Sequence, residues 1–323
     1  MFVVRFDLRS PGVDRRGRAA RHRAAVDMAR FVDQHGCASI VLSEHHASDD
    51  GYLPSPFLLA AAMAAATSST PIVVAVAILP LHNPVRLAED IVTLDHLSEG
   101  RAMVVLGLGY RPVEYELYGV EFSRRGRIAD EKLARLLELL DGAGAARDAV
   151  RVTPPPFTSP RPNLAWGGGS PAAARRAGRH GLGFFAQTDA AELRTEYEAA
   201  ARAAGHEPGL CVLPSPAAPY ATFVTEDEDR GWEEVGPSLL ADAVGYWEWN
   251  RAAGTAEGRA SFSSATTVDE LRAARGAHRV VTAAAARELL AEHGLLTLHP
   301  LCGGLDPDIA WPYLERGVAA ATT

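Results

Sequence analysis

The sequence predicts an α/β protein, a (β/α)8 barrel of the TIM type with an insertion before the last strand. Short apolar runs alternate with longer segments of helical periodicity, about eight times along 323 residues. One run, PIVVAVAILP at 71–80, is almost wholly apolar, as expected of a parallel strand with both faces buried. No linker or change of composition divides the chain, so a single domain over 1–323 is expected. A doubly wound sheet is the main alternative.

The first half of the chain predicts four strands and four helices. The strands are expected at 1–6, 37–43, 71–80 and 101–110, and the helices at 18–35, at 55–67, from 84 onward and at 124–141. The third helix is the best defined, since Asn83 can cap it, Pro84 suits its first turn and Gly100 can close it in a left-handed conformation. Its apolar face is formed by Leu87, Ala88, Ile91 and Leu94.

The second half repeats the unit after a proline-rich crossing at 152–164, which cannot be regular helix. Residues 164–181 predict a strand, a glycine turn and a helix. Further strands are expected at 182–187, 220–225 and 295–301, and further helices at 190–204, 282–293 and 306–318. The polar stretch at about 225–275, acidic at EDEDR, is expected to form helices and loops inserted after the seventh strand.

Composition narrows the class of protein. A formal net charge of -8 argues against nucleic acid or an anionic membrane as the main partner. No apolar run approaches the roughly 20 residues of a membrane span, and residues 1–17 lack the apolar core of a signal peptide. Cys37, Cys211 and Cys302 are widely separated and show no metal spacing, which fits a reducing compartment. A soluble cytoplasmic protein is expected.

The stretch VLSEHHASDDG at 41–51 places Glu44, His45 and His46 where the second strand ends. In a parallel barrel this end forms the catalytic mouth. Adjacent strand residues point to opposite faces, so the two histidines cannot easily bind one metal ion, and the chain contains no H-x-H. No metal is expected. A purely structural role, with hydrogen bonds to nearby loops, is the alternative, but three ionisable groups together favour a functional site.

A second candidate site is AWGGGS at 165–170, which runs directly into a helix at Pro171. Glycines let the backbone approach a ligand closely, and a helix start offers free N–H groups to an anion. Ser170 can cap the helix or donate to a phosphate. LGLGY at 106–110 is a similar strand end, but it is not a dinucleotide fingerprint, because G-x-G-x-x-G is incomplete at Pro112.

Taken together, these segments resemble the bacterial-luciferase-like family of flavin-dependent oxidoreductases. SEHH at 43–46 resembles the family signature at the end of the second strand. The longest match is LPLHNPVRLAEDIVTLDHLSEGRAMVVLGLGY at 79–110, and GVEFSRRGRIADE, GGGSPAAARRAGRHGLG and HPLCGGLDPDIAW match later segments. The resemblance covers nearly the whole chain; residues 40–185 match most specifically and 205–280 least.

The resemblance implies a barrel that holds a flavin, or a deazaflavin, at its C-terminal mouth. His45 matches the functional histidine beside the isoalloxazine ring. The positions matched to cofactor binding are Glu44, Ala75, Val76, Gly107, Gly109, Gly168, Gly169 and Ser170. Gly168 to Ser170 match the turn that holds the cofactor phosphate, and Ala75–Val76 aligns with the family's non-prolyl cis peptide behind the ring. Glu44 is expected to orient or anchor.

The chain departs from the luciferases beside this site. Gly107 and Leu108 stand where luciferases carry cysteine and arginine, so a luciferase-style phosphate contact is missing. Arg111 is the residue expected to supply the charge instead. Tyr52, Tyr110 and the 225–275 insertion are candidates for capping the pocket.

The resemblance, through SEHH together with GGGS, therefore favours a monooxygenase that uses reduced FMN and O2 on a small organic substrate and receives the flavin from a separate reductase. The alternative is a deazaflavin-dependent oxidoreductase that transfers hydride. Such members often carry Asp-His where Glu44–His45 stands, which favours FMN; they often carry Ser-Val at Ala75–Val76, which is ambiguous. A non-catalytic flavin-binding relative is a third interpretation, and a metal-dependent hydrolase ranks last. The resemblance also implies a homodimer through helices around 55–100.

Overall fold

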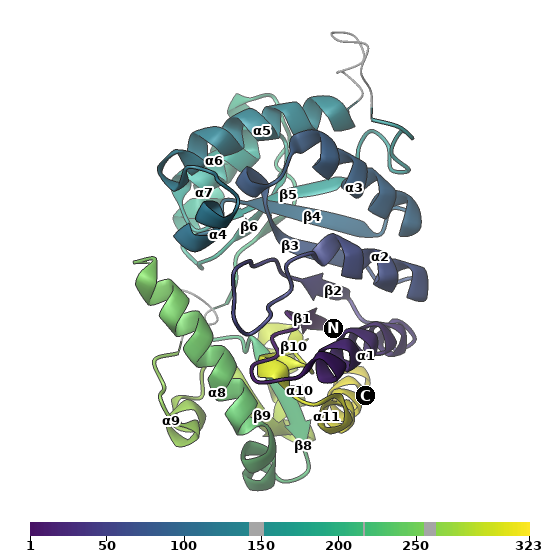
Figure 1. Ribbon diagram of the computed structural model, residues 1–323, viewed down its shortest axis with the longest axis vertical. Coiled ribbons are helices and arrows are strands. Elements are labelled where there is room, and N and C mark those ends of the chain that lie inside the picture. The colour runs from purple at the N-terminus through teal and green to yellow at the C-terminus, as the bar shows by residue number, and fades with distance from the viewer. Residues whose placement is uncertain (142–151, 216, 255–262) are drawn as a thin grey trace.

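Ten parallel strands form one sheet in the part of the chain that the computed structural model describes, residues 1–141, 152–215, 217–254 and 263–323. Eight of them are the predicted strands: β1 Phe2–Phe6, β2 Ser39–Leu42, β3 Ile72–Ile78, β4 Ala102–Gly107, β5 Asn163–Gly168, β6 Gly183–Ala186, β8 Ala221–Thr225 and β10 Leu296–Leu298. The order is β7-β6-β5-β4-β3-β2-β1-β10-β8-β9. The parallel strands and surrounding helices confirm the TIM-like barrel class (Figure 1).

Two strands were not predicted. β7 (Cys211–Val212) pairs with β6, and β9 (His278–Thr282) pairs with β8, so both lie at the ends of the strand order. The prediction that 220–225 and 295–301 are consecutive strands was therefore wrong. β7 is too short to show a period, and β9 begins with His278 and Arg279, which hide its apolar character.

The helices cover the outer faces of the strands (Figure 1), and their bounds agree closely with the predicted ones except for α4, which was not predicted. They are α1 Arg15–Asp33, α2 Pro56–Ala66, α3 Pro84–Leu97, α4 Pro112–Leu117, α5 Arg125–Leu140, α6 Pro171–Arg179, α7 Ala191–Ala203, α10 Ala283–His293 and α11 Pro307–Thr322, with 3-10 turns at Leu79–Leu81, Phe122–Arg124 and Cys302–Gly304. Asn83 caps α3 through Val85 N at 2.9 Å, as predicted. None of the described helices has the length and apolar composition that a membrane span requires.

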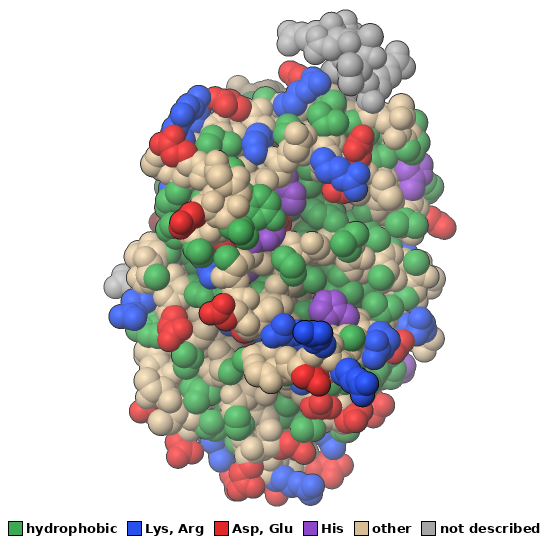
Figure 2. Space-filling model, viewed as in Figure 1, with side chains coloured by type: hydrophobic (Ala, Val, Ile, Leu, Met, Phe, Trp, Pro, Cys, Tyr) green, Lys and Arg blue, Asp and Glu red, His purple; other side chains and the backbone are tan. Residues whose placement is uncertain are grey.

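The predicted insertion contains two helices, α8 (Glu228–Ala252) and α9 (Val268–Ala274). Residues 255–262 of the insertion lie outside the described residues. Figure 2 shows acidic side chains gathered at the end of the molecule where α8 begins, and Glu226, Asp227 and Asp229 belong to this part of the chain. The acidic run is thus a solvated helix start, capped by Asp227. The rest of α8 reaches the mouth of the barrel.

Alternation along the strands separates two apolar layers. On β4, Val104 and Leu106 belong to the large core between the strands and the helices, whereas Val105 packs with Val73 and Ala165 in a small inner cluster. β1 follows the same rule, because Phe2, Val4 and Phe6 are buried in the outer core. Its intervening residues, among them Arg5, therefore face the barrel interior.

Candidate active site

A cavity of about 730 Å³ lies at the carboxyl ends of the strands. It is lined by nine of the ten positions selected from the sequence: Glu44, His45, Ala75, Val76, Gly107, Gly109, Gly168, Gly169 and Ser170. These residues lie in β3, at the ends of β4 and β5, or shortly after β2, β4 and β5, so the parallel strands bring together segments that lie far apart in the chain. The imidazole of His45 and the glycine turn share one cavity.

His45 is held from behind by a buried acid. Its Nδ1 lies 2.7 Å from Oε1 of Glu114, at the start of α4. Glu114 is ionised, because hydrogen bonds from His45 and the backbone N–H of His46 outweigh its burial and lower its pKa. A carboxylate only accepts, so Nδ1 carries the proton and donates it. Nε2 takes part in none of the hydrogen bonds found between described residues, which leaves it available to a ligand in the cavity.

Burial also lowers the pKa of His45, and the nearby guanidinium groups of Arg111 and Arg9 act in the same direction, against the opposing effect of Glu114. The imidazole is therefore neutral at pH 7. Its ring makes edge contacts with Tyr52 at 4.8 Å and with Trp249 at 4.9 Å between centroids. A neutral imidazole with a fixed tautomer and one open nitrogen is suited to accepting a proton.

Glu44 has a different role from Glu114. Its Oε1 accepts from Nε2 of His46 at 2.8 Å and from Nε2 of His82 at 2.9 Å, while Oε2 accepts from the backbone N–H of Ile78 at 2.9 Å. These hydrogen bonds outweigh the effect of burial and lower the pKa of Glu44 to about 2. The carboxylate thus ties the end of β2 to the end of β3. This geometry matches the expected anchoring role.

Arg111 is the one selected residue that does not line the cavity. Its Nη1 donates to the carbonyl of His46 at 2.6 Å and to Oε1 of Glu114 at 3.2 Å, and its guanidinium lies 4.0 Å from the ring centroid of Trp249. Arg111 therefore supports the loop and the acid behind His45. The geometry gives no support to the expected phosphate contact.

Of the three described arginines that do line the cavity, two come from the helices α5 and α6. Arg125 is the first residue of α5, and Arg176 lies on α6. Arg176 is held by a two-pronged contact with Asp130, at 2.6 and 3.1 Å, whereas Arg125 donates to the carbonyl of Phe122 at 3.0 Å and forms no ion pair within the described residues. One uncompensated cation is therefore present beside the glycine turn.

The glycine turn brings the start of α6 against this cavity. Ser170 caps the helix by accepting from Ala173 N at 3.3 Å. A Cβ on Gly168 would lie 2.6 Å from the Cβ of Ala173, so the close approach of helix and strand requires glycine here. N–H groups in the first helical turn have no intrahelical acceptor. These N–H groups and the charge of Arg125 are the kind of groups that bind an anion such as a phosphate.

A bulge in β3 forms part of the cavity wall, on a strand that lies between those leading to His45 and to the glycine turn. The peptide bond Ala75–Val76 is cis, as the resemblance implied, and the register with β4 skips Val76. The Val76 side chain occupies space that only glycine leaves open, since a Cβ on Gly107 or Gly167 would meet it at 3.0 or 2.9 Å. The glycines thus make room for Val76, whose apolar side chain forms part of the cavity wall.

Several tyrosines also line the cavity, and one of them, Tyr246, comes from the insertion. Tyr246 on α8 bonds through its hydroxyl to the hydroxyls of Tyr52, at 2.8 Å, and Tyr220, at 3.3 Å. Trp249 on the same helix contacts the edge of the His45 ring from outside the cavity lining. The predicted capping role of Tyr52 and of the insertion is thus consistent with the placement of these rings, while Tyr110 also lines the cavity.

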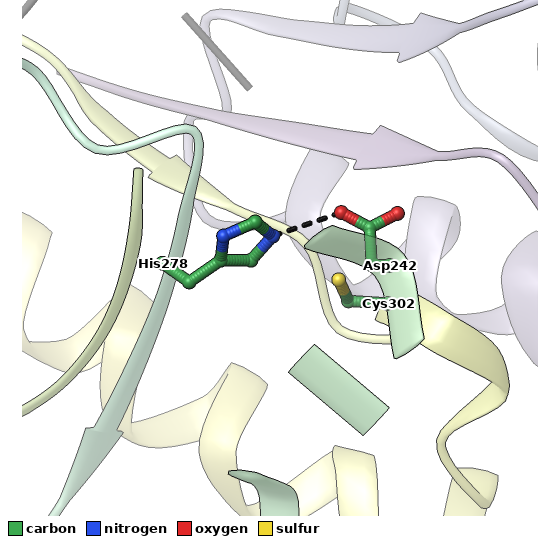
Figure 3. A group of neighbouring side chains, drawn as sticks. All are labelled: Asp242, His278 and Cys302. Atoms are coloured by element: carbon green, nitrogen blue, oxygen red, sulfur yellow. Dashed lines mark hydrogen bonds and ion pairs between the residues drawn. The ribbon is translucent and has the colours of Figure 1, made fainter. Parts of the chain in front are cut away.

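Asp242, His278 and Cys302 point toward one another (Figure 3). Oδ2 of Asp242 lies 2.8 Å from Nε2 of His278, and its Oδ1 lies 3.6 Å from Nε of Arg9. Burial raises the pKa of Cys302 well above its usual value, so the thiol keeps its proton. Arg9 and His278 thus both contact the carboxylate of Asp242, and the contact with His278 links α8 to β9.

A parallel α/β barrel with a cavity at the carboxyl ends of its strands is the arrangement of (β/α)8 barrel enzymes. Within this class, the chain belongs to the luciferase-like monooxygenase family, whose sequence pattern matches residues 3–296.

Individual relatives support this assignment. The chain is 32% identical over 117 residues to 4-hydroxyprotoasukamycin monooxygenase of Streptomyces nodosus subsp. asukaensis, covering 36% of the chain and 32% of the relative. It is 29% identical over 105 residues to the alkanal monooxygenase alpha chain of Photorhabdus luminescens, covering 32% and 29%. The chain thus matches about a third of the length of these curated relatives.

Solved structures match over almost the whole chain. The monooxygenase RslO1 of Streptomyces bottropensis superposes with a TM-score of 0.71 at 20% identity, covering 99% of this chain and 98% of that one. The oxygenating constituent of 3,6-diketocamphane monooxygenase of Pseudomonas putida, in complex with FMN, gives 0.71 at 18% identity, covering 100% and 98%. An F420-dependent secondary alcohol dehydrogenase gives 0.67 at 16%, covering 99% and 98%. At these identities the similarity establishes the fold.

Proposed function

We propose that the protein is a monooxygenase that binds reduced FMN and uses O2 to oxidise a small organic substrate, with a separate flavin reductase supplying the cofactor. The observation that carries this proposal is one cavity that joins the open nitrogen of His45 to an anion site at the glycine turn. Val76, whose apolar side chain lines the cavity, lies on β3. In the strand order, β3 stands between β2, which leads to His45, and β5, which leads to the glycine turn.

The residues present fit a flavin mononucleotide. Gly168, Gly169, Ser170 and the start of α6 would hold the phosphate, and Arg125 would supply the charge that Arg111 does not bring into the cavity. The Ala75–Val76 bulge would support one face of the ring. When bound, reduced FMN supplies the electrons with which O2 is activated.

The protein's own contribution is proton transfer and exclusion of water. Nε2 of His45 accepts a proton from a reacting group, and the Glu114 carboxylate stabilises the positive charge that results. Tyr52 and Trp249 cover this imidazole and keep water away. Replacing His45 by alanine should lower turnover by about 10²- to 10⁴-fold. Unchanged turnover and reoxidation in His45→Ala would favour a flavin-binding relative without catalysis.

The choice of cofactor is tested by binding. Purified apoprotein is titrated with FMN and with a deazaflavin coenzyme, and the affinities are compared by absorbance and fluorescence. The proposal expects tight binding of FMN in its reduced form and O2 consumption that depends on substrate. Tight deazaflavin binding without detectable FMN binding would replace the proposal by a hydride-transferring oxidoreductase, in line with the F420-dependent alcohol dehydrogenase among the similar structures.

The assembly is proposed to be a homodimer through α2 and α3. α2 contains no charged residue, and its exposed positions Leu58, Ala62 and Ala65 follow one another on a single face. Figure 2 shows hydrophobic side chains gathered over this helix. A face of this composition is typical of a surface that packs against another chain.

A further inference from the structure

Arg5 is a second uncompensated cation in the same cavity, at a different place from Arg125. It lies on β1 and lines the cavity, because the alternation of that strand turns Arg5 toward the barrel interior. The phosphate site is on β5, α5 and α6, and in the strand order β4, β3 and β2 lie between β5 and β1. The cavity therefore has two separate positive groups, Arg5 on β1 and Arg125 at the start of α5.

Arg5 lacks the acidic partners that its neighbour Arg9 has. Arg9 forms ion pairs with Asp50 at 2.9 Å, Asp242 at 3.6 Å and Asp7 at 3.8 Å. Arg5 forms no ion pair within the described residues, and its Nε is buried without a hydrogen-bond partner. Nε and Nη2 of Arg9 also lack hydrogen-bond partners, but carboxylates balance the charge of Arg9. A guanidinium that faces a cavity without a balancing carboxylate is costly, so Arg5 favours an anionic ligand.

The groups around Arg5 are neutral. Its guanidinium lies 4.4 Å from the ring centroid of Tyr220. Burial raises the pKa of Tyr220, Tyr246 and Tyr52, so these hydroxyls keep their protons and cannot balance the charge. They do form a continuous line of hydroxyls, from Tyr220 through Tyr246 to Tyr52, whose ring contacts His45. This line connects Arg5 to the reacting end of the cavity.

We propose that Arg5 anchors the substrate, and that the substrate is a small organic acid whose carboxylate pairs with this guanidinium while its remaining atoms lie along the tyrosines toward His45. The assignment of Arg5 to the substrate and not to the cofactor rests on the proposed function, in which Arg125 and the glycine turn hold the phosphate. A guanidinium presents two parallel N–H donors, which match the two oxygens of a carboxylate. The tyrosine rings suit an aromatic or otherwise apolar body.

The first test uses the wild-type protein and two probes of nearly equal shape. Benzoate and benzamide differ mainly in charge, and their binding is measured by calorimetry, both to the apoprotein and in the presence of saturating oxidised FMN. We expect benzoate to bind at least about tenfold more tightly, as a charge-assisted contact requires. Equal affinities, or no benzoate binding, would overturn the proposal without any substitution being made.

The second test assigns the preference to Arg5. In Arg5→Met the difference between benzoate and benzamide should disappear, whereas Arg5→Lys, which keeps the charge but not the fork, should retain part of it. Arg16→Met, which removes an exposed arginine of α1, is the control and should behave as wild type. A preference that survives in Arg5→Met overturns the proposal.

The two tests distinguish a failure of the Arg5 proposal from a failure of the proposed function. If Arg5→Met weakens FMN binding in the absence of benzoate and leaves the benzoate preference intact, Arg5 belongs to the cofactor site and the inference is wrong. If the wild type does not bind FMN, while benzoate binding to the apoprotein still depends on Arg5, the proposed function fails and the anion site remains.

Discussion

Nδ1 of His45 and Oε1 of Glu114 lie 2.7 Å apart, although 69 positions separate the two residues in the chain. The contact fixes the tautomer of the imidazole and raises its pKa, against the larger lowering by burial. In Glu114→Gln the charge is lost, so the pKa of His45 should fall further. The acid limb of the pH–activity profile should move to lower pH, together with a loss of turnover. An unchanged profile in a folded variant would contradict the role given to Glu114.

Gly168 should be essential for cofactor affinity. In Gly168→Ala the new methyl group would meet Ala173 at 2.6 Å and push α6 away from the strand end. We expect FMN to bind about tenfold more weakly, equivalent to about 1.4 kcal/mol, in a fluorescence titration. Gly276→Ala is a matched control, because no atom lies within 4 Å of its Cβ position. Equal losses in both variants would show that the effect is not local.

Glu44 should make stability depend on pH. Its pKa is about 2 in the folded protein, below the usual 4.5, so its stabilisation is fully present above pH 4.5 and is lost as pH falls toward 2. The difference corresponds to roughly 3 kcal/mol. Glu44→Gln should therefore lower the free energy of unfolding at pH 7 by a similar amount. The deficit should shrink at pH 3, as measured by urea denaturation, and a deficit independent of pH would argue against this account.

The proposed homodimer is tested at Leu58, whose side chain is 76% exposed on α2. Leu58→Glu places a charge in the apolar face and should give a monomer in sedimentation equilibrium, while the wild type is a dimer. Leu117→Glu is the control, since Leu117 is also exposed, at 62%, but lies on α4. A wild-type monomer, or a dimer that survives Leu58→Glu, would exclude this interface.

The strands and most helices could be predicted because burial on both faces leaves long apolar runs, as at 71–80, and because caps such as Asn83 are local signals. β9 was not predicted, because its sequence lacks a long apolar run. His278 is polar in sequence, and only its pairing with Asp242 on α8, 36 positions away, allows it to be buried in a strand. Long-range ion networks of this kind leave no periodic pattern.

The site could be predicted in part. His45 and the glycine turn stand out as clusters at strand ends, whereas Glu114 follows Pro112 and looks like an ordinary position in an exposed helix. Arg125 likewise looks like one of several arginines in SRRGR. Arg111 was selected by proximity in the chain, but its guanidinium turns toward Glu114 and the carbonyl of His46. The role of each of these three residues depends on the direction of its side chain, and a single sequence does not show that direction.

The helix α8 contributes Tyr246 and Asn250 to the lining of the cavity, while the strand ends, the glycine turn and Arg125 contribute most of the rest. These two sets of residues come from separate stretches of chain, so they can diverge independently. Under the proposed function, exchanging the residues of α8 that line the cavity, with Asp242 and Trp249 retained, should change which substrate is oxidised and leave cofactor binding unchanged. Substrate choice and cofactor binding would then depend on different parts of the chain, and one could change in evolution without the other.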